Sequence, residues 1–414
     1  MVKPGYKQTE IGVIPEDWED RKLGDVGKVC MCKRIFADQT SDTGEIPFFK
    51  IGTFGKEADA YISRELYEDF KRRFSYPQRG DVLISAAGTL GRSVVFDGKD
   101  SYFQDSNIVW LDIDKEQLCN EYLYHYYKVI QWASSEGSTI ARLYNGIICN
   151  THIAVPIVEE QKQIATVLSE VDELVSLTEK QLTKKKAIKQ GAMQELLTGK
   201  KRLPGFSGEW QAFVFGELFD FIPNNAFTRA QMADSGKVKN IHYGDILTKY
   251  GAYVDGGSSS IPYISRNVDL SRFADRCYLQ SGDIIIADTA EDETVGKVLE
   301  VVNVNCPILA GQHTLLCRPK IRFADKFLGY YLNAACYHDQ LLPYIVGTKV
   351  SSVSKASVAQ TKLVVPEYEE QQAIAESLSN MDSEIEALEQ KLKKYRQVKQ
   401  GMMQQLLTGK IRLV

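Results

Sequence analysis

Four carboxylates close together in the sequence, Asp288, Glu291, Asp292 and Glu293, have the side-chain chemistry to hold a divalent cation. A metal-dependent nuclease would also need a lysine at a set spacing from them, and this stretch lacks it. A solvated acidic loop is therefore the favoured interpretation. Phosphate-binding loops, zinc-protease motifs, nucleophile elbows and glycine-rich cofactor loops are also absent from the sequence. The sequence disfavours an enzyme, and a stand-alone DNA nuclease remains as an alternative.

Basic and aromatic side chains in the predicted loops offer a different chemistry, which is binding to nucleic acid. Lysine and arginine neutralise phosphates or bind guanine edges, whereas asparagine and glutamine suit adenine. The formal net charge of the chain is -4, so DNA would have to be met through a local basic face. The simpler interpretation of any one loop lysine is that it is merely solvated. The candidate DNA-binding residues are Lys33, Arg34, Lys56, Lys71, Arg72, Arg73, Arg92, Arg229, Lys239, Tyr243, Lys249 and Arg266.

The eight cysteines are scattered and form no C-x-x-C pair, which argues against a disulfide framework and against a zinc site. The first residues carry no hydrophobic signal core, and no apolar run reaches membrane-spanning length. We expect a cytoplasmic protein that does not enter a membrane.

A repeat of 48 residues determines the organisation of the chain. Residues Pro156–Leu203 align without a gap with Pro366–Leu413, and 24 of the 48 positions are identical. Each copy begins with a proline and glutamates and ends in Leu-Leu-Thr-Gly-Lys, which is typical of one long helix. A helix from Glu159 to Leu197 would be about 58 Å long. The chain is therefore a duplication.

Apolar residues in each repeat recur at steps of four and three, which predicts a coiled-coil seam. Ile374, Leu378 and Met381 begin the seam of the second copy, and Ile164 and Leu168 begin that of the first. Two copies of one self-complementary stripe pair most simply in antiparallel orientation. A scaffold that binds only protein would also use such helices and is a second alternative.

Glycines interrupt both predicted helices at equivalent positions, Gly191 and Gly401. Each costs about 1 kcal/mol relative to alanine. We expect close approach of the helices, or a bend, to explain them.

The regions between the repeats are mixed and rich in predicted strands. Gly80–Phe96 and Gly282–Val301 each predict a strand, a glycine-containing turn and a second strand. A further strand and then a helix follow in both regions, with the helices expected at Glu121–Trp132 and Lys326–Tyr337. The two regions share this plan while their loops differ, which favours two binding surfaces for different targets on one frame.

The order of variable domain, repeated helix, variable domain and repeated helix resembles the specificity subunits of type I restriction–modification systems. The resemblance covers essentially the whole chain. Its most specific residues are the helix entries Pro156–Gln161 and Pro366–Gln371 and the paired Leu-Leu-Thr-Gly-Lys exits. It implies an α+β protein in which two mixed, strand-rich target-recognition domains are separated by two long antiparallel coiled-coil helices, in a pseudo-two-fold duplication. We expect a first target-recognition domain at 1–155, the central repeated helix at 156–203, a second target-recognition domain at 204–365 and the C-terminal repeated helix at 366–414.

The resemblance also implies a function. Such subunits are non-catalytic and bind double-stranded DNA, each domain contacting one half of a split, asymmetric target. Their repeated helices set the number of unread base pairs and dock two methylation subunits, and restriction subunits join to cleave. S-adenosylmethionine is expected on the methylation subunits, with no cofactor or metal on this chain. The residues expected to serve in partner docking and in the spacer helices are Gln161, Gly191, Leu197, Gln371, Gly401 and Leu407.

Overall fold

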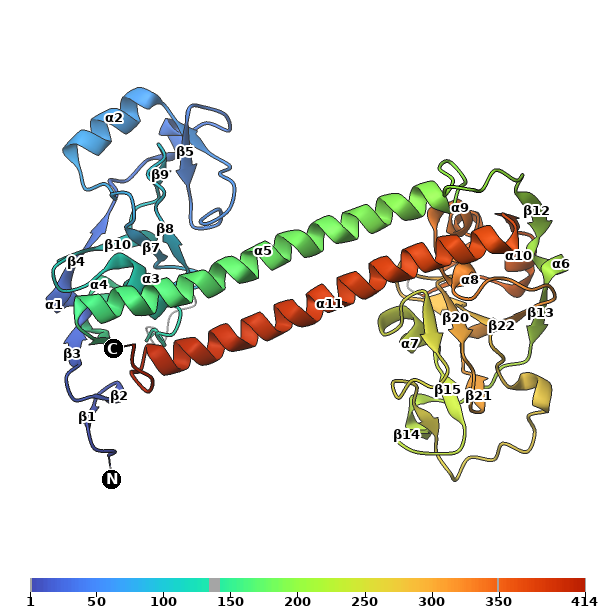
Figure 1. The fold of residues 1–414 in the computed structure, drawn as a ribbon. Helices are drawn as coiled ribbons and strands as arrows, with labels where there is room; N and C mark the ends of the chain where they lie inside the picture. The colour runs from blue at the N-terminus through green and yellow to red at the C-terminus, as the bar shows by residue number, and fades with distance from the viewer. Residues whose placement is uncertain (1, 134–141, 348–349, 414) are drawn as a thin grey trace. The chain divides into compact units, whose positions relative to one another are not determined.

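Two helices of 39 residues each run through the computed structural model, α5 (Val158–Leu196) and α11 (Tyr368–Leu406) (Figure 1). The structure describes residues 2–133, 142–347 and 350–413. The chain divides into two units, one of Met1–Glu179 with Lys391–Val414 and the other of Lys180–Gln390. Each unit therefore contains one strand-rich domain, one end of α5 and the opposite end of α11. The predicted long helices are confirmed to within a residue or two at their ends.

The domain of the first unit, called domain 1, is built on a four-stranded antiparallel sheet in the order β4-β10-β7-β8. These strands are Gly27–Met31, Ile108–Ile113, Val82–Ser85 and Ser93–Val95. A smaller sheet joins β6 (Tyr61–Ile62), β5 (Ile46–Phe49) and β9 (Tyr102–Phe103). The other elements are β1 (Tyr6–Thr9), β2 (Gly12–Pro15), β3 (Glu19–Lys22), α1 (Leu23–Val26), α2 (Arg64–Arg73), α3 (Asn120–Tyr127), α4 (Asn145–Asn150) and β11 (His152–Val155).

The domain of the second unit, called domain 2, repeats this topology with one more strand in its main sheet, in the order β13-β22-β18-β20-β16. These strands are Phe219–Ile222, Thr314–Pro319, Ile284–Ala287, Val298–Val302 and Tyr253–Asp255. The smaller sheet contains β14 (Met232–Ala233), β17 (Tyr263–Ile264), β15 (Lys239–Ile241) and β21 (Ile308–Ala310). The other elements are β12 (Gln211–Val214), α6 (Phe215–Leu218), α7 (Tyr243–Thr248), β19 (Thr289–Ala290), α8 (Phe327–Leu332), α9 (Ala335–His338), β23 (Ser351–Ser352), α10 (Lys355–Ala359) and β24 (Lys362–Val365). The prediction that both domains share one plan is confirmed.

The two helices expected within the domains are shorter than predicted. The first, α3, ends at Tyr127, and the second is split into α8 and α9. The split falls at Asn333, whose amide nitrogen donates to the carbonyl oxygens of Gly329 and Val298 at 2.6 and 2.7 Å. Its amide oxygen accepts from the Val298 backbone at 2.9 Å. The Asn333 side chain therefore makes hydrogen bonds to β20 at the point where the helix is interrupted. The hydrophobic periodicity of the sequence does not reveal these bonds.

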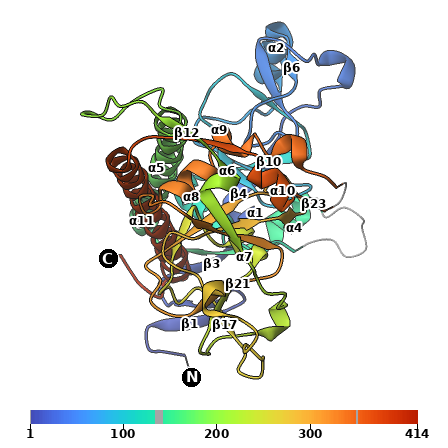
Figure 2. The ribbon, with the colours of Figure 1, turned by 90° about the vertical axis from the view of Figure 1, so that its right-hand side faces the viewer.

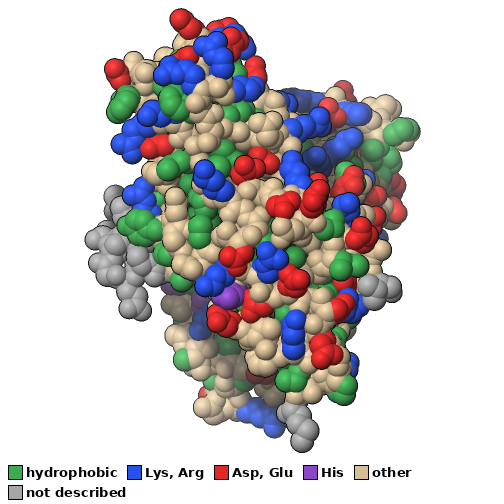
Figure 3. Space-filling model, turned by 90° about the vertical axis from the view of Figure 1, so that its left-hand side faces the viewer, with side chains coloured by type: hydrophobic (Ala, Val, Ile, Leu, Met, Phe, Trp, Pro, Cys, Tyr) green, Lys and Arg blue, Asp and Glu red, His purple; other side chains and the backbone are tan. Residues whose placement is uncertain are grey.

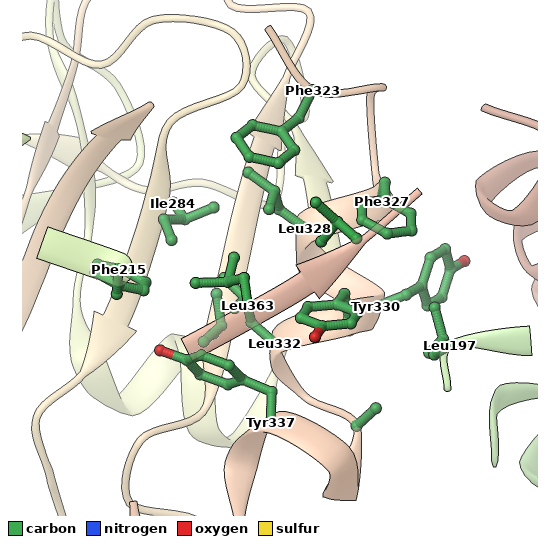
Figure 4. Packing of buried hydrophobic residues seen from close by; sticks show 14 of the residues in the cluster. Leu197, Phe215, Ile284, Phe323, Phe327, Leu328, Tyr330, Leu332, Tyr337 and Leu363 are labelled. Carbon is green, nitrogen blue, oxygen red and sulfur yellow. The ribbon is translucent and has the colours of Figure 1, made fainter. Parts of the chain in front are cut away.

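Each long helix shares the core of the domain at each of its ends. In the second unit Ile374 and Leu378 of α11 belong to the same buried cluster as Phe215, Leu328 and Leu332. Figure 4 shows side chains of this cluster converging from several elements, with Leu197 from the exit of α5 among them. The first unit has the matching arrangement, in which Leu168 of α5 and Leu406 of α11 pack with the domain core. A helix end is thus held to its domain by burial of apolar surface.

Ion pairs between α5 and α11 show that the helices are antiparallel within each unit (Figures 1 and 2). In the first unit Lys399 pairs with Asp172, and Arg396 with Glu179 at 2.7 Å. In the second unit Lys189 pairs with Asp382, and Lys186 with Glu389 at 2.6 Å. Lys189 and Lys399 are repeat equivalents, as are Asp172 and Asp382, so each pair is made twice with the roles of the helices exchanged. The antiparallel pairing expected from the duplicated stripe is confirmed.

Among the described helices, none is both long and apolar enough to cross a membrane.

A buried histidine lies beside the helix pair of the first unit. His125 of α3 is fully buried, and one ring nitrogen lies 3.0 Å from the Ser169 hydroxyl. The other ring nitrogen lies 4.0 Å from the Asp172 carboxylate, which also receives Lys128 and Lys399. Burial, together with the ammonium groups of Lys128 and Lys399, lowers the pKa of His125 to about 4. His125 is therefore neutral in the folded chain at neutral pH.

Acid should weaken the first unit through His125. Because its folded pKa lies below the usual 6.5, its contribution is complete above pH 6.5 and is lost as the pH falls toward 4. The loss should reach on the order of 3 kcal/mol. Hydrogen exchange of α3 amides, followed from pH 7 to pH 4, should show this loss in the wild type and not in His125→Gln. The second unit provides an internal control. There the repeat equivalent of Asp172, which is Asp382, accepts a hydrogen bond from Tyr330 of α8 and not from a histidine. An identical pH profile for wild type and variant would contradict the assignment.

Candidate nucleic-acid interface

Three loops meet at one end of the main sheet in each domain. In domain 1, Met31 at the end of β4 and Ser85 at the end of β7 lie opposite Val109 and Ile108 at the start of β10. The segments 32–36, 86–92 and 104–107 therefore gather there, and we call them the loop end of domain 1. In domain 2, β13 and β18 end beside the start of β22 in the same way. Its loop end consists of 223–231, 288–296 and 311–313.

The loop end of domain 1 contains three of the predicted DNA-binding residues, Lys33, Arg34 and Arg92. The exposed Arg34 donates to the Asp105 carboxylate at 2.9 Å. Arg92, also exposed, donates to the Phe54 carbonyl at 3.0 Å and so ties the turn between β7 and β8 to the loop between β5 and β6. Both guanidinium groups stay at the surface. A third arginine, Arg142, lies at the same place and was missed from the sequence.

The loop end of domain 2 contains the predicted Arg229, and Tyr243 lies next to it. Arg229 is more than half exposed and pairs with the buried Asp245 carboxylate at 3.0 Å. The Tyr243 ring packs edge-on against the ring of His313, with ring centres 5.3 Å apart. His313 was not predicted from the sequence. Its only sequence signal is its place directly before β22, which Asn107 shares before β10.

The basic run on α2 is largely paired within the helix. Arg72 and Arg73 both contact Asp69, at 3.1 and 2.7 Å. The Lys71 ammonium donates to the Tyr67 hydroxyl at 2.7 Å. The charges on this face are therefore partly neutralised already. Figure 3 shows one face of the molecule, where basic and acidic side chains are interspersed.

The remaining predicted residues differ in how accessible their side chains are to DNA. Lys239 is 3% exposed, and its ammonium donates to the carbonyls of Gly256 and Ser258 at 3.0 and 2.8 Å. In this conformation Lys239 stabilises the fold and is closed to DNA. Lys249 donates to the Ser260 carbonyl from an exposed position. The side chains still exposed at the surface are Lys33, Lys56 and Arg266.

A second repeated site joins the start of one long helix to the segment that follows the other. In the first unit both oxygens of Glu160 accept from Arg412, at 2.7 and 2.8 Å, and the Trp18 indole donates to the same carboxylate at 3.0 Å. Arg412 also reaches Asp17 and lowers the pKa of that carboxyl. In the second unit Glu370 accepts two hydrogen bonds at 2.5 Å from Arg202, the repeat equivalent of Arg412. We call these two sites the helix junctions.

Glycine and glutamine complete each junction. Gly409 has φ +65°, and a Cβ added there would lie 2.4 Å from the Pro15 ring, so only glycine fits the turn. The buried amide of Gln161 donates to the carbonyls of Gln117 and Pro156 and accepts from the Cys119 backbone at 2.9 Å. Gln371 repeats the bond to Pro366 and accepts from Ala324. The repeated sequence motifs are therefore explained by contacts inside the chain.

The six residues expected to serve in docking or in the spacer helices fall into two groups. Four of them are buried within their own unit: Gln161, Leu197, Gln371 and Leu407. Gly191 and Gly401 differ, because a Cβ added at either meets no described atom within 4 Å. Close approach of the helices inside this chain therefore does not account for the two glycines, contrary to one expectation from the sequence.

Removing Arg412 should destabilise the first unit by about 3 kcal/mol, since it leaves the buried Glu160 carboxylate without its cation. Urea unfolding of Arg412→Ala would measure this loss. Lys410→Ala, which removes an exposed cation two residues away, should change stability little. The double variant Arg412→Ala with Glu160→Gln should recover part of the loss. Equal stability of Arg412→Ala and the wild type would show that the junction contributes nothing.

Comparison with known proteins places these features in a family. The profile described as the type I restriction modification DNA specificity domain matches residues 15–188 and again residues 207–395. The putative type I restriction enzyme specificity subunit S.HindORF215P of Haemophilus influenzae is 55% identical over 159 residues, which cover 38% of this chain and 41% of that protein. The chain thus matches less than half the length of that relative.

Two further similarities extend over nearly the whole chain. The MjaVIII specificity subunit of Methanocaldococcus jannaschii is 24% identical over 422 residues, covering 97% of this chain and 94% of that protein. The type I S subunit of M. genitalium shares the fold, with a TM-score of 0.60, 14% identity and coverage of 98% and 99% of the two chains. The chain belongs to the family of type I restriction–modification DNA specificity subunits and carries the domain of that family twice.

Proposed function

We propose that this chain selects the DNA target of a type I restriction–modification complex, with each domain contacting one half of a split, asymmetric site. The observation that carries the proposal is a contrast within the chain. The helix junctions repeat the same arginine–glutamate contact in both units. The loop ends, on equivalent sheets, present different side chains, with Arg34 and Arg92 in one and Arg229 and His313 in the other. A common frame with unlike loops suits recognition of two unlike half-sites.

The partners of this assembly belong to the same proposal. Two methylation subunits, carrying S-adenosylmethionine, would bind the long helices, and restriction subunits would join them. The repeated surface that suits such docking lies around Gly191 and Gly401, where Ile188 and Val398 are equivalent residues. These two side chains are 47% and 43% exposed, so they leave apolar surface at the same place on both helices. Two equal surfaces fit two copies of one partner.

A cytoplasmic location is part of the proposal.

We further propose that the chain itself is not catalytic. Among the residues that the structure describes, no group of three or more histidine, cysteine, aspartate or glutamate side chains is arranged to hold a metal ion. The nuclease alternative is tested by incubating the purified chain with magnesium and duplex DNA. Cleavage that Asp292→Ala abolishes would favour a nuclease. A scaffold that binds only protein would leave no sequence-selective DNA footprint with the reconstituted complex.

Exchanging one domain should change one half of the target. Residues 20–155 would be replaced by the corresponding domain of another specificity subunit, and methylated positions would be mapped genome-wide. The wild type should give a bipartite motif, which disappears when the chain is deleted. The exchange should alter one half-site and leave the other intact, because the loop ends belong to separate domains. A change in both halves would contradict independent recognition.

Alanine at Gly191 or Gly401 should have opposite effects on folding and on assembly. Since the added methyl meets open space, each substitution should stabilise the free chain by about 1 kcal/mol. If a partner packs closely there, the methyl should weaken binding of the methylation subunit by about tenfold. Thermal unfolding and titration calorimetry would measure the two effects. Gln181→Ala, at an exposed position of α5, is the control and should leave binding unchanged. Unchanged affinity in both glycine variants would place docking elsewhere.

A further inference from the structure

The loop that directly precedes the central strand holds an unusual backbone conformation in both domains. Ser106, before β10, has φ 51°, and His313, before β22, has φ 55°. Such left-handed values are uncommon for residues other than glycine, and they concentrate at functional sites. Glycine would adopt them without strain. Ser106 and His313 therefore occupy positions that the backbone alone would give to glycine.

The two loops are equivalent in their backbone hydrogen bonds. Before each loop, Gln104 donates to the Phe49 carbonyl at 2.9 Å, and Gly311 to the Ile241 carbonyl at 2.8 Å. After it, the Asn107 carbonyl accepts from Ala86 at 2.7 Å. The His313 carbonyl accepts from Asp288 at 3.2 Å in the same way. Asn107 therefore corresponds to His313, and residues 105–106 of domain 1 lie where domain 2 has Gln312 alone.

The loop of domain 2 is held firmly while its side chains remain accessible. The Asn224 amide donates to the carbonyls of Gly311 and Thr314, one on each side of the loop. The His313 side chain is 45% exposed, with the Tyr243 ring against it and the Asp288 carboxylate 3.8 Å away. Its ring nitrogen lies 3.2 Å from the Gln312 amide nitrogen. A partly buried amide and a half-exposed imidazole are therefore presented together on a fixed backbone.

The corresponding loop of domain 1 presents an amide between two arginines. Arg142 donates to the Ser106 hydroxyl and to the Asn107 amide oxygen, at 3.2 and 3.0 Å. Arg34 contacts Asp105 on the other side. Among the described residues, none accepts a hydrogen bond from the Asn107 amide nitrogen, and the amide oxygen has a second lone pair beyond the bond from Arg142. Both loops thus offer one amide at the loop end, surrounded by different charges.

Amide side chains match one DNA base in particular. An asparagine or glutamine can accept from N6 and donate to N7 of adenine in the major groove, a pairing that no other base edge reproduces. Phosphates, in contrast, are contacted mainly by positive charge and carry no direct sequence information. A rigid, partly exposed amide without its own charge is suited to discrimination among bases.

We propose that residues 105–107 and 312–313 are the equivalent base-contacting loops of the two domains, with Asn107 and Gln312 each pairing with an adenine in its own half-site. The proposal rests on the proposed function and assigns the residues that set its specificity. His313, braced by Tyr243, positions the Gln312 amide.

The test uses the full chain assembled with its methylation subunits and duplexes that carry the motif mapped for the wild type. In Gln312→Ala, replacing one A·T pair of the half-site of domain 2 should no longer lower affinity, and the preference lost should be about tenfold or more. Asn107→Ala should relax one A·T pair in the other half-site only. Each variant is the control for the other, because the half-site that its domain does not contact should keep its full preference.

His313→Gly separates a positioning role from a purely structural one. Glycine accepts φ 55° without strain, so this variant should be at least as stable to urea as the wild type. It should still lose preference in the half-site of domain 2. Lower stability with unchanged preference would show that the ring serves folding only and would overturn its assigned role.

Three further outcomes keep the inference distinct from the proposed function. If the wild-type complex selects a bipartite motif but both alanine variants keep all base preferences, the base-contacting loops are wrong and the proposed function stands. A uniform loss of affinity on all sequences, with a weaker salt dependence, would indicate phosphate contacts and would also overturn the inference. A wild-type complex without any bipartite motif would overturn both.

Discussion

The structure depends on one constraint, which is that the buried carboxylate at the start of each long helix must be paired. Glu160 and Glu370 are each taken out of water, and a buried carboxylate is tolerated only with a cation and hydrogen bonds in fixed positions. The cation comes from the segment that follows the other helix, Arg412 in one unit and Arg202 in the other. The start of one helix is therefore stable beside the end of its partner, which requires antiparallel pairing. The ion pairs along the helices, such as Lys399 with Asp172, repeat the same orientation.

This constraint explains why the repeats remain alike while the loops differ. The junction contacts use residues from both copies, so a change in one copy disturbs a contact made by the other. The loop ends are separate from these contacts, since Arg92 donates to Phe54 and His313 packs against Tyr243, each within its own domain. Their side chains can change without loss of the helix junction. Repeated helices and unlike loops are consequences of the same arrangement.

The sequence allowed the prediction of elements whose pattern is local. The long helices were placed to within a residue or two because proline, glutamate and glycine mark their ends. The strand pairs β7 with β8 and β18 with β20 were recognised from apolar runs around glycine. The split between α8 and α9 was not foreseen, because the Asn333 side chain bonds to a strand far away in the sequence.

The candidate interface was only partly foreseen, for the same reason. Charge type identified Arg34, Arg92 and Arg229, but it could not reveal that Lys239 is buried against the carbonyls of a later loop. His313 belongs to no charge pattern in the sequence. Its significance depends on its own backbone angle φ and on its contact with Tyr243. Gln161 and Gln371 were expected at the helices, yet their hydrogen bonds join segments that the sequence does not show to be neighbours.

An acidic chain is compatible with selective DNA binding on physical grounds. Sequence-independent affinity comes from neutralising phosphates, and a chain with net charge -4 supplies little of it. Several of its arginines are also engaged internally, as Arg72 and Arg73 are with Asp69. Base edges, in contrast, are recognised by oriented donors and acceptors that need no net charge. A protein that has weak affinity for phosphates and holds its amides in fixed positions binds non-target sequences only weakly, because phosphate contacts supply most of the affinity for those sequences. Most of the difference between target and non-target DNA then arises at the bases.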